Sequence, residues 1–168
     1  MISQKICLLG APAVGKTSLA RRFVFSTFSD KYHSTIGVKI DKKSIVVDDM
    51  DVNLIIWDVQ GEDRYQKVLG AYLKGSAACI LVVDVMRPET AEIAMSLMDQ
   101  IVTKNGPIPY CLMLNKCDLG PSTEMRSLLS PLIDNAVDTI DTSAKTGDGV
   151  DDAFLALACA LMPEQKTG

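Results

Sequence analysis

The chain lacks an excess of positive charge. Lysine and arginine together number 17 and aspartate and glutamate 21, so the formal net charge is −4 at pH 7. A protein held to nucleic acid or to an anionic membrane by charge alone should be basic. We therefore expect no nucleic-acid partner and no membrane contact that rests on charge.

The chain also lacks the histidine and cysteine patterns of metal centres and disulfide frameworks. Its only histidine, His33, falls in a polar stretch and is expected to be a loop residue. The five cysteines are odd in number, contain no CxxC pair and fall mostly in apolar runs. This pattern is typical of a reduced intracellular protein whose thiols are small apolar core residues.

No long hydrophobic run is present. The longest, residues 153–162, falls short of the roughly 20 residues that a membrane-spanning helix needs. The chain shows no secretory signal, no glycine after the first methionine for myristoylation and no prenylatable cysteine at its end. We expect a cytoplasmic protein with no membrane anchor in this chain, which meets membranes only through partners or through a tail that the sequence does not contain.

What the sequence does have is an alternation of short apolar runs and helical patterns along 168 residues, a length that fits a single domain over residues 1–168. We expect strands at residues 6–9, 38–47, 52–57, 79–83, 110–114 and 137–140, and helices at 16–25, 88–104, 122–133 and 148–162. Asp48-Asp49 is a turn signal, so the strands on either side should form a hairpin. This order predicts an α/β fold with a mostly parallel sheet and one antiparallel edge strand.

Residues 10–17, Gly-Ala-Pro-Ala-Val-Gly-Lys-Thr, match the phosphate-loop pattern GxxxxGK[ST]. They follow a strand and open a helix, a context that argues against an ordinary glycine-rich turn. Lys16 should reach the β- and γ-phosphates, and Thr17 should offer its hydroxyl to Mg²⁺. Pro12 removes one N–H group from the loop but adds rigidity. The predicted nucleotide contacts here are Ala13, Val14, Gly15, Lys16, Thr17 and Ser18.

Two motifs after later strands predict a guanine site. In Asn115-Lys116-Cys117-Asp118, the Asp118 carboxylate can accept both adjacent guanine donors, N1–H and the 2-amino group. Adenine would leave this carboxylate unpaired, which favours GTP over ATP. Asn115 should tie the base loop to the phosphate loop. A solvated turn of mixed charge is the alternative for this motif taken alone.

The second motif is Thr142-Ser143-Ala144-Lys145. The Ala144 N–H should donate to guanine O6, and the neighbouring Ser143 is also a predicted nucleotide-binding residue. The stems of Lys116 and Lys145 should pack on the two faces of the ring.

Two further loops carry the predicted sensors of Mg²⁺ and of the γ-phosphate. Asp58 opens Asp58-Val59-Gln60-Gly61 and should hold Mg²⁺, while the Gly61 N–H should bond a γ-phosphate oxygen. Thr35 lies near the end of a polar loop and is predicted to be a Mg²⁺ ligand when GTP is bound. Loss of the γ-phosphate would release Thr35 and Gly61, so both loops should relax.

These five motifs, in their order along nearly the whole chain, resemble the Ras superfamily of small GTPases. Thr35-Ile36-Gly37-Val38 and Ile56-Trp57-Asp58 are most similar to its Rab branch, although Ile40 stands where Rab proteins carry phenylalanine. The resemblance implies a P-loop fold with a six-stranded sheet flanked by five helices, and a GTP-hydrolysing switch. It also implies that Phe28 stacks on the guanine edge.

The resemblance further implies a monomer that meets its protein partners through two switch loops, residues 26–37 and 59–73. The implied partners are effectors, an exchange factor and a GTPase-activating protein. Trp57, Tyr65 and Val38 are candidates for an apolar patch that effectors contact, with ordinary core packing as the alternative.

Two residues depart from the family pattern near the predicted γ-phosphate position. Glu62 stands where most members have the glutamine that orients the attacking water. An ionised carboxylate only accepts hydrogen bonds, so we expect slow hydrolysis, unless Glu62 merely stabilises the first turn of the next helix. Gln60 replaces the usual alanine. With Lys16, Thr35 and Gly61, Glu62 completes the predicted catalytic set.

Two other classes of function stay open from the sequence. A GTP-binding scaffold or exchange-controlled module with negligible hydrolysis is favoured by Glu62. A P-loop ATPase or small-molecule kinase is disfavoured by Asp118. Arg64 could act as an internal catalytic arginine, but a solvated switch residue is the preferred interpretation.

Overall fold

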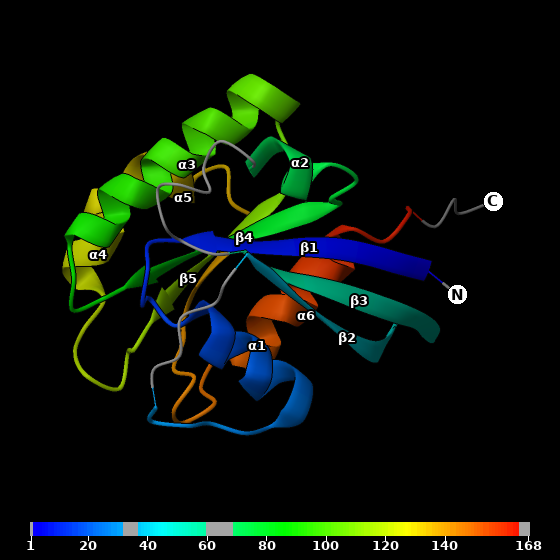
Figure 1. The fold of residues 1–168 in the computed structure, drawn as a ribbon, viewed down its shortest axis with the longest axis horizontal. Helices are drawn as coiled ribbons and strands as arrows, with labels where there is room; N and C mark the ends of the chain where they lie inside the picture. The colour runs from blue at the N-terminus through cyan, green and yellow to red at the C-terminus, as the bar shows by residue number, and fades with distance from the viewer. Residues whose placement is uncertain (1, 32–36, 60–68, 165–168) are drawn as a thin grey trace.

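The computed structural model describes residues 2–31, 37–59 and 69–164. Its centre is a six-stranded sheet in the order β2-β3-β1-β4-β5-β6 (Figure 1). The strands are β1 (Ile2–Gly10), β2 (Val38–Val47), β3 (Met50–Val59), β4 (Ala78–Asp84), β5 (Tyr110–Asn115) and β6 (Asp138–Asp141). All neighbours run parallel except β2 and β3, so the expected mostly parallel sheet with one antiparallel edge strand is confirmed.

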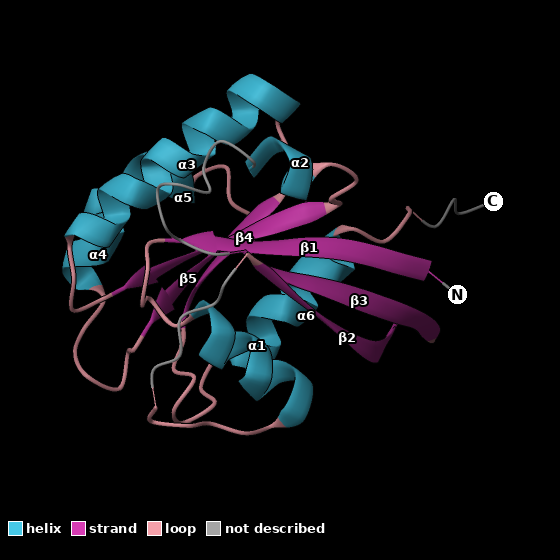
Figure 2. Ribbon diagram, in the orientation of Figure 1, coloured by secondary structure: helices cyan, strands magenta, loops and turns pink. Residues whose placement is uncertain are grey.

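Helices cover both faces of the sheet (Figure 2). One face packs on α1 (Lys16–Phe25) and α6 (Val150–Ala160). The other packs on α2 (Leu69–Leu73), α3 (Glu89–Asn105), α4 (Thr123–Leu128) and α5 (Ser130–Ile133). Within the described residues, no helix is long and apolar enough to cross a membrane.

The central strands are apolar on both sides because both sides are covered. Ile6 and Leu8 of β1 join the core under α1 and α6, whereas Cys7 and Leu9 join the core under α3. Every residue of β4 is buried. This two-sided burial explains why these strands appear in the sequence as continuous apolar runs.

Three of the cysteines are buried core residues, as the sequence indicated. Cys7 and Cys79 lie in the core under α3, and Cys111 lies in the opposite core. Burial raises the pKa of the Cys111 thiol to about 12 and also raises the pKa values of Cys7 and Cys79. These thiols are therefore protonated and unreactive at neutral pH.

The β2–β3 hairpin turns through Asp48 and Asp49, as expected. Their φ angles are 50° and 64°, so both lie in the left-handed region. Two successive left-handed residues match the twist of a two-residue hairpin turn, and aspartate tolerates this conformation better than most residues.

The helix predicted over residues 122–133 is divided into α4 and α5, so the described residues contain six helical segments where five were expected. Pro131 is the cause, because it has no N–H to donate to the carbonyl of Ser127 and its ring would crowd that carbonyl. Leu129 joins the two pieces with φ −91° and ψ 5°. The last helix also begins later than expected, at Val150, after the left-handed Gly149 (φ 69°).

Candidate nucleotide-binding site

The predicted motifs meet at the carboxyl edge of the sheet. The register places Leu8 of β1 beside Asp58 of β3, and Asp84 at the end of β4 beside Asn115 at the end of β5. The loop from Gly10 to Lys16 leaves β1 at this edge. Parallel strands bring their carboxyl ends together, so the site follows from the topology.

The shape of the phosphate loop depends on its two glycines. Gly15 has φ 104°, and a Cβ there would lie 2.3 Å from Asn115 Nδ2. At Gly10, a Cβ would lie 2.4 Å from the carbonyl oxygen of Val82. Ala13 is also left-handed, with φ 61°. Alternation of right- and left-handed residues turns successive N–H groups to one side, which is the geometry of an anion-binding nest.

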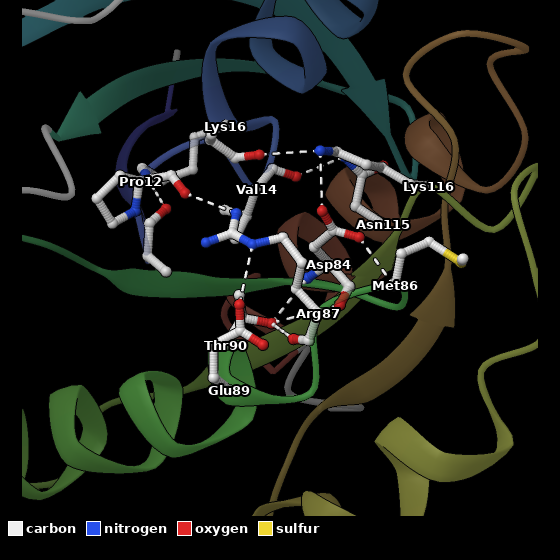
Figure 3. A network of polar contacts seen from close by, with 12 residues as sticks. Pro12, Val14, Lys16, Asp84, Met86, Arg87, Glu89, Thr90, Asn115 and Lys116 are labelled. Carbon is white, nitrogen blue, oxygen red and sulfur yellow. Dashed lines mark hydrogen bonds and ion pairs between the residues drawn. The ribbon is translucent and has the colours of Figure 1, made fainter.

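Three successive carbonyls of this loop accept hydrogen bonds from side chains beyond it (Figure 3). Arg87 Nη1 donates to the carbonyl of Pro12 at 3.0 Å, and Lys116 Nζ donates to that of Ala13 at 2.9 Å. Asn115 Nδ2 donates to the carbonyl of Val14 at 2.9 Å. The Asn115 tie between the base and phosphate loops was expected; the two cationic contacts were not.

Lys16 is the cation buried in the phosphate loop. Its side chain is 7% exposed, and Nζ donates to the carbonyls of Gly10 and Ala11 at 3.0 and 2.8 Å. Burial lowers the pKa of Lys16 to about 8, the negative charge of Asp58 opposes this, and the positive charge of Arg87 lowers it further. An anionic ligand beside this buried ammonium would stabilise its charged form.

Thr17 and Asp58 form the expected oxygen pair for a metal ion. Thr17 Oγ1 lies 2.5 Å from Asp58 Oδ2, and Asp58 is 1% exposed. A hydroxyl and a carboxylate that converge beside a phosphate loop are the hard oxygen donors that Mg²⁺ prefers. The residues therefore fit Mg²⁺ as a bound group.

The base loop is held by a chain of hydrogen bonds. Thr142 Oγ1 donates to Asn115 Oδ1 at 3.1 Å, and Ser143 Oγ donates to Asp118 Oδ1 at 2.7 Å. Asp118 is nevertheless exposed, so its carboxylate can meet a ligand. Ala144, the expected donor to guanine O6, is 4% exposed.

Arg22 of α1 also supports this loop, a role that sequence reasoning missed. Its Nε donates to the carbonyl of Ala144 at 2.7 Å and Nη2 to that of Lys145 at 2.5 Å. Arg22 lies in the last turn of α1, and its reach to a loop more than 100 residues later appears only in three dimensions. Arg87, by contrast, has a weak sequence signal, because it lies just beyond the end of a buried strand, where site residues gather.

Several predicted residues fall outside the described part of the chain. These are Thr35, Gly61 and Glu62 of the predicted catalytic set, together with His33, Gln60, Arg64 and Tyr65. Phe28, the predicted guanine-stacking aromatic, is described and is 36% exposed.

Trp57 and Val38, candidates for an effector patch, are partly buried against the core under α3. Lys5 Nζ lies 3.6 Å from the centroid of the Trp57 ring, and the Tyr72 ring lies 6.5 Å from it. Ile40 lies opposite Trp57 on β2 and is 51% exposed. Core packing and an accessible face therefore coexist at Trp57.

The motifs, their geometry and the fold all agree with a comparison of the sequence with known families. The family model of the Ras family matches residues 5–162. This chain belongs to the Ras family. It is a Rab-like small GTPase of the P-loop fold, a class of GTP-binding switches with GTPase activity that interact with effectors, exchange factors and activating proteins.

The relatives with similar sequences include proteins named as Rab proteins. The chain is 34% identical to the Ras-related protein Rab-7b of Mus musculus, over 99% of this chain and 86% of the relative. It is 29% identical to the Ras-related proteins Rab-7b and Rab-7a of Paramecium octaurelia, over 96% of this chain and 82% of each relative. The similarity thus spans nearly the whole chain.

Proposed function

We propose that this Rab-like GTPase is a single-domain switch that binds GTP and GDP with Mg²⁺, hydrolyses GTP slowly and presents GTP-ordered loops, residues 26–37 and 59–73, to effectors. The observation that carries the proposal is the position of Asn115. Its amide donates to Val14 of the phosphate loop and accepts from Thr142 of the second base motif. One buried side chain therefore joins the base site to the phosphate site.

Base selection would come from Asp118. Its carboxylate is exposed and oriented by the Ser143 hydroxyl. It can accept both guanine donors at once, and the Ala144 N–H can serve guanine O6. An adenine ring would offer a lone pair to the carboxylate, which supports GTP over ATP as the substrate.

The phosphates would be held by Lys16 and by the N–H groups of the glycine-shaped loop. Thr17 and Asp58 would hold Mg²⁺, with Thr35 as a further proposed ligand. Bound Mg²⁺ would neutralise charge on the phosphate oxygens. Gly61 is proposed to bond the γ-phosphate through its N–H group.

The slow hydrolysis step rests on the chemistry of Glu62. An ionised carboxylate can accept a hydrogen bond from the attacking water but cannot also donate one to the γ-phosphate, as a glutamine amide can. A second candidate function follows from the same residue: a GTP-binding scaffold or exchange-controlled module with negligible hydrolysis. The two differ only in the hydrolysis rate of the loaded protein.

Effectors, an exchange factor and a GTPase-activating protein are the proposed partners, and they would meet a cytoplasmic monomer through the switch loops. The exposed Ile40 beside the partly buried Trp57 offers an apolar contact next to these loops. The acidic net charge of −4 supports protein partners rather than nucleic acid.

Exchange of base specificity tests this function. Asp118→Asn should weaken GDP binding by about 100-fold or more and create binding of xanthosine diphosphate. The reason is that an asparagine amide can donate to the xanthine C2 carbonyl that replaces the guanine amino group. Displacement of a fluorescent guanine nucleotide gives both affinities, with Asp99→Asn, exposed on α3, as the matched control. If ATP displaced the probe from the unaltered protein as well as GTP does, the proposed function would be wrong.

A further inference from the structure

Arg87 makes a contact with the phosphate loop that none of the motifs anticipates. It lies in the loop between β4 and α3, and its Nη1 donates to the carbonyl of Pro12 at 3.0 Å (Figure 3). The neighbouring carbonyls of Ala13 and Val14 are bonded by the two side chains of the base motif, Lys116 and Asn115. Arg87 therefore completes a set of three side-chain donors to three successive carbonyls of the phosphate loop.

The backbone of Arg87 is fixed on both sides, so this reach is not that of a loose surface side chain. Its N–H donates to the carbonyl of Asp84 at 2.9 Å, and its carbonyl accepts from Thr90 Oγ1 at 2.7 Å. Asp84 is 2% exposed and pairs with Lys116 Nζ at 2.9 Å. Asp84 thus contacts both residues whose cations bond the phosphate loop: its backbone carbonyl accepts from the Arg87 N–H, and its carboxylate pairs with Lys116.

The bond to Pro12 acts on the peptide group that Pro12 shares with Ala13. A guanidinium donor makes a charge-assisted hydrogen bond, and such a bond polarises the peptide that accepts it. Polarisation increases the positive partial charge on the N–H of Ala13, the first predicted phosphate donor of the loop. The charge on the Ala13 N–H matters in this loop because Pro12 itself contributes no N–H group.

Arg87 also lies at the end of the loop where the outer phosphates are expected. Lys16 Nζ, the predicted β- and γ-phosphate contact, lies 3.0 and 2.8 Å from the carbonyls of Gly10 and Ala11. Pro12 follows these residues directly. The Arg87 guanidinium therefore bonds the carbonyl next to the two carbonyls that bond the Lys16 ammonium.

We propose that Arg87 is a positioning residue that favours the triphosphate: its guanidinium holds and polarises the Pro12–Ala13 peptide and adds positive charge where the third phosphate binds. The inference rests on the proposed guanine-nucleotide function. Glu89, whose Oε1 lies 3.2 Å from Arg87 Nε, moderates this charge. Removal of Arg87 should therefore weaken GTP binding more than GDP binding, and removal of the Glu89 charge should do the opposite.

The test compares dissociation constants for GDP and for a non-hydrolysable GTP analogue, both with Mg²⁺. Arg87→Ala should lower the preference for the triphosphate about tenfold relative to the unaltered protein. Arg87→Lys, which keeps the charge and a donor, should retain most of the preference, and Arg87→Gln, which keeps only a donor, should fall between them. Glu89→Gln should raise the preference by about twofold. Arg21→Ala, exposed on α1, makes the same change in net charge and should leave the ratio unchanged.

The ratio of the two dissociation constants separates this role from a purely structural one. A loosened loop would weaken the binding of GDP and of the GTP analogue equally. An unchanged ratio in Arg87→Ala would overturn the inference, whatever happened to the melting temperature. If Arg87→Ala did not fold, an unchanged ratio in Glu89→Gln would overturn it instead. An unaltered protein that bound neither guanine nucleotide would reject the proposed function itself, which no result on the ratio alone can do.

Discussion

At the scale of single residues, the phosphate loop depends on positions that no side chain can occupy. A Cβ at Gly15 would lie 2.3 Å from the Asn115 amide nitrogen, which bonds the carbonyl of Val14. Gly15 also has φ 104°, a conformation that costs a side chain about 1–2 kcal/mol. One methyl group there would break the link between base and phosphate sites.

We predict that Gly15→Ala lowers guanine-nucleotide affinity by at least about 100-fold, because Asn115 must move away from Val14. Equilibrium titration with a fluorescent nucleotide measures this effect. Gly106→Ala is the matched control, since Gly106 at the end of α3 is also left-handed (φ 78°) but a Cβ there meets no atom within 4 Å. Equal affinities in the two variants would contradict this account of the loop.

Glu62 is the residue on which the rate of hydrolysis is expected to depend. We predict that Glu62→Gln accelerates single-turnover GDP formation by about tenfold or more, because the amide can both accept from water and donate to the γ-phosphate. Chromatography of GTP-loaded protein over time gives the rate. Glu92→Gln, exposed on α3, makes the same chemical change away from the site. If the unaltered protein hydrolysed GTP at least as fast as Glu62→Gln, Glu62 would not be an obstacle.

At the scale of elements, the β2–β3 hairpin turns through two strained aspartates. Asp49 has φ 64°, where glycine is free of the cost that other residues bear. Asp49→Gly should therefore raise the free energy of unfolding by roughly 0.5–1 kcal/mol. Asp51→Gly, an exposed position within β3, should lower it by a similar amount. Urea unfolding of both variants checks the prediction, and a destabilised Asp49→Gly would contradict the turn geometry.

Periodicity predicted the sheet, the hairpin and the bounds of α1, because buried strands and an amphipathic helix each leave a regular apolar pattern. It did not predict the break between α4 and α5, because the apolar pattern continues past Pro131 while the missing N–H interrupts the hydrogen bonds. It also missed the polar start of β1, where Ser3, Gln4 and Lys5 conceal a strand.

In the candidate site, too, some residues could be predicted from a sequence pattern and others could not. Asn115, Asp118 and Lys16 were predictable because each belongs to a motif with fixed spacing. Arg22 was not predictable, and only the place of Arg87 just beyond a buried strand indicated it, because both act on carbonyls of loops that the folded chain alone brings near them. Long side chains that reach a site from its edges belong to no motif of fixed spacing, so the sequence does not reveal them.

At the scale of the whole molecule, the sheet acts as a rigid platform for one composite site. Five parallel strands deliver the phosphate loop, Asp58, Asp84 and both base motifs to a single edge. Cores on both faces hold these strands in register. A nucleotide that bridges the loops at this edge should therefore stabilise the entire domain, not one segment of it.

Thermal unfolding with added nucleotides tests the central claim most directly, that this edge of the sheet binds guanine nucleotide with Mg²⁺. GDP with Mg²⁺ at about 100 times its dissociation constant should add about 3 kcal/mol of stability and raise the melting temperature by roughly 5–10 °C. ATP at the same concentration should produce no comparable shift, and chelation of Mg²⁺ should reduce the effect of GDP. An equal shift with ATP, or no shift with GDP and Mg²⁺, would contradict the account.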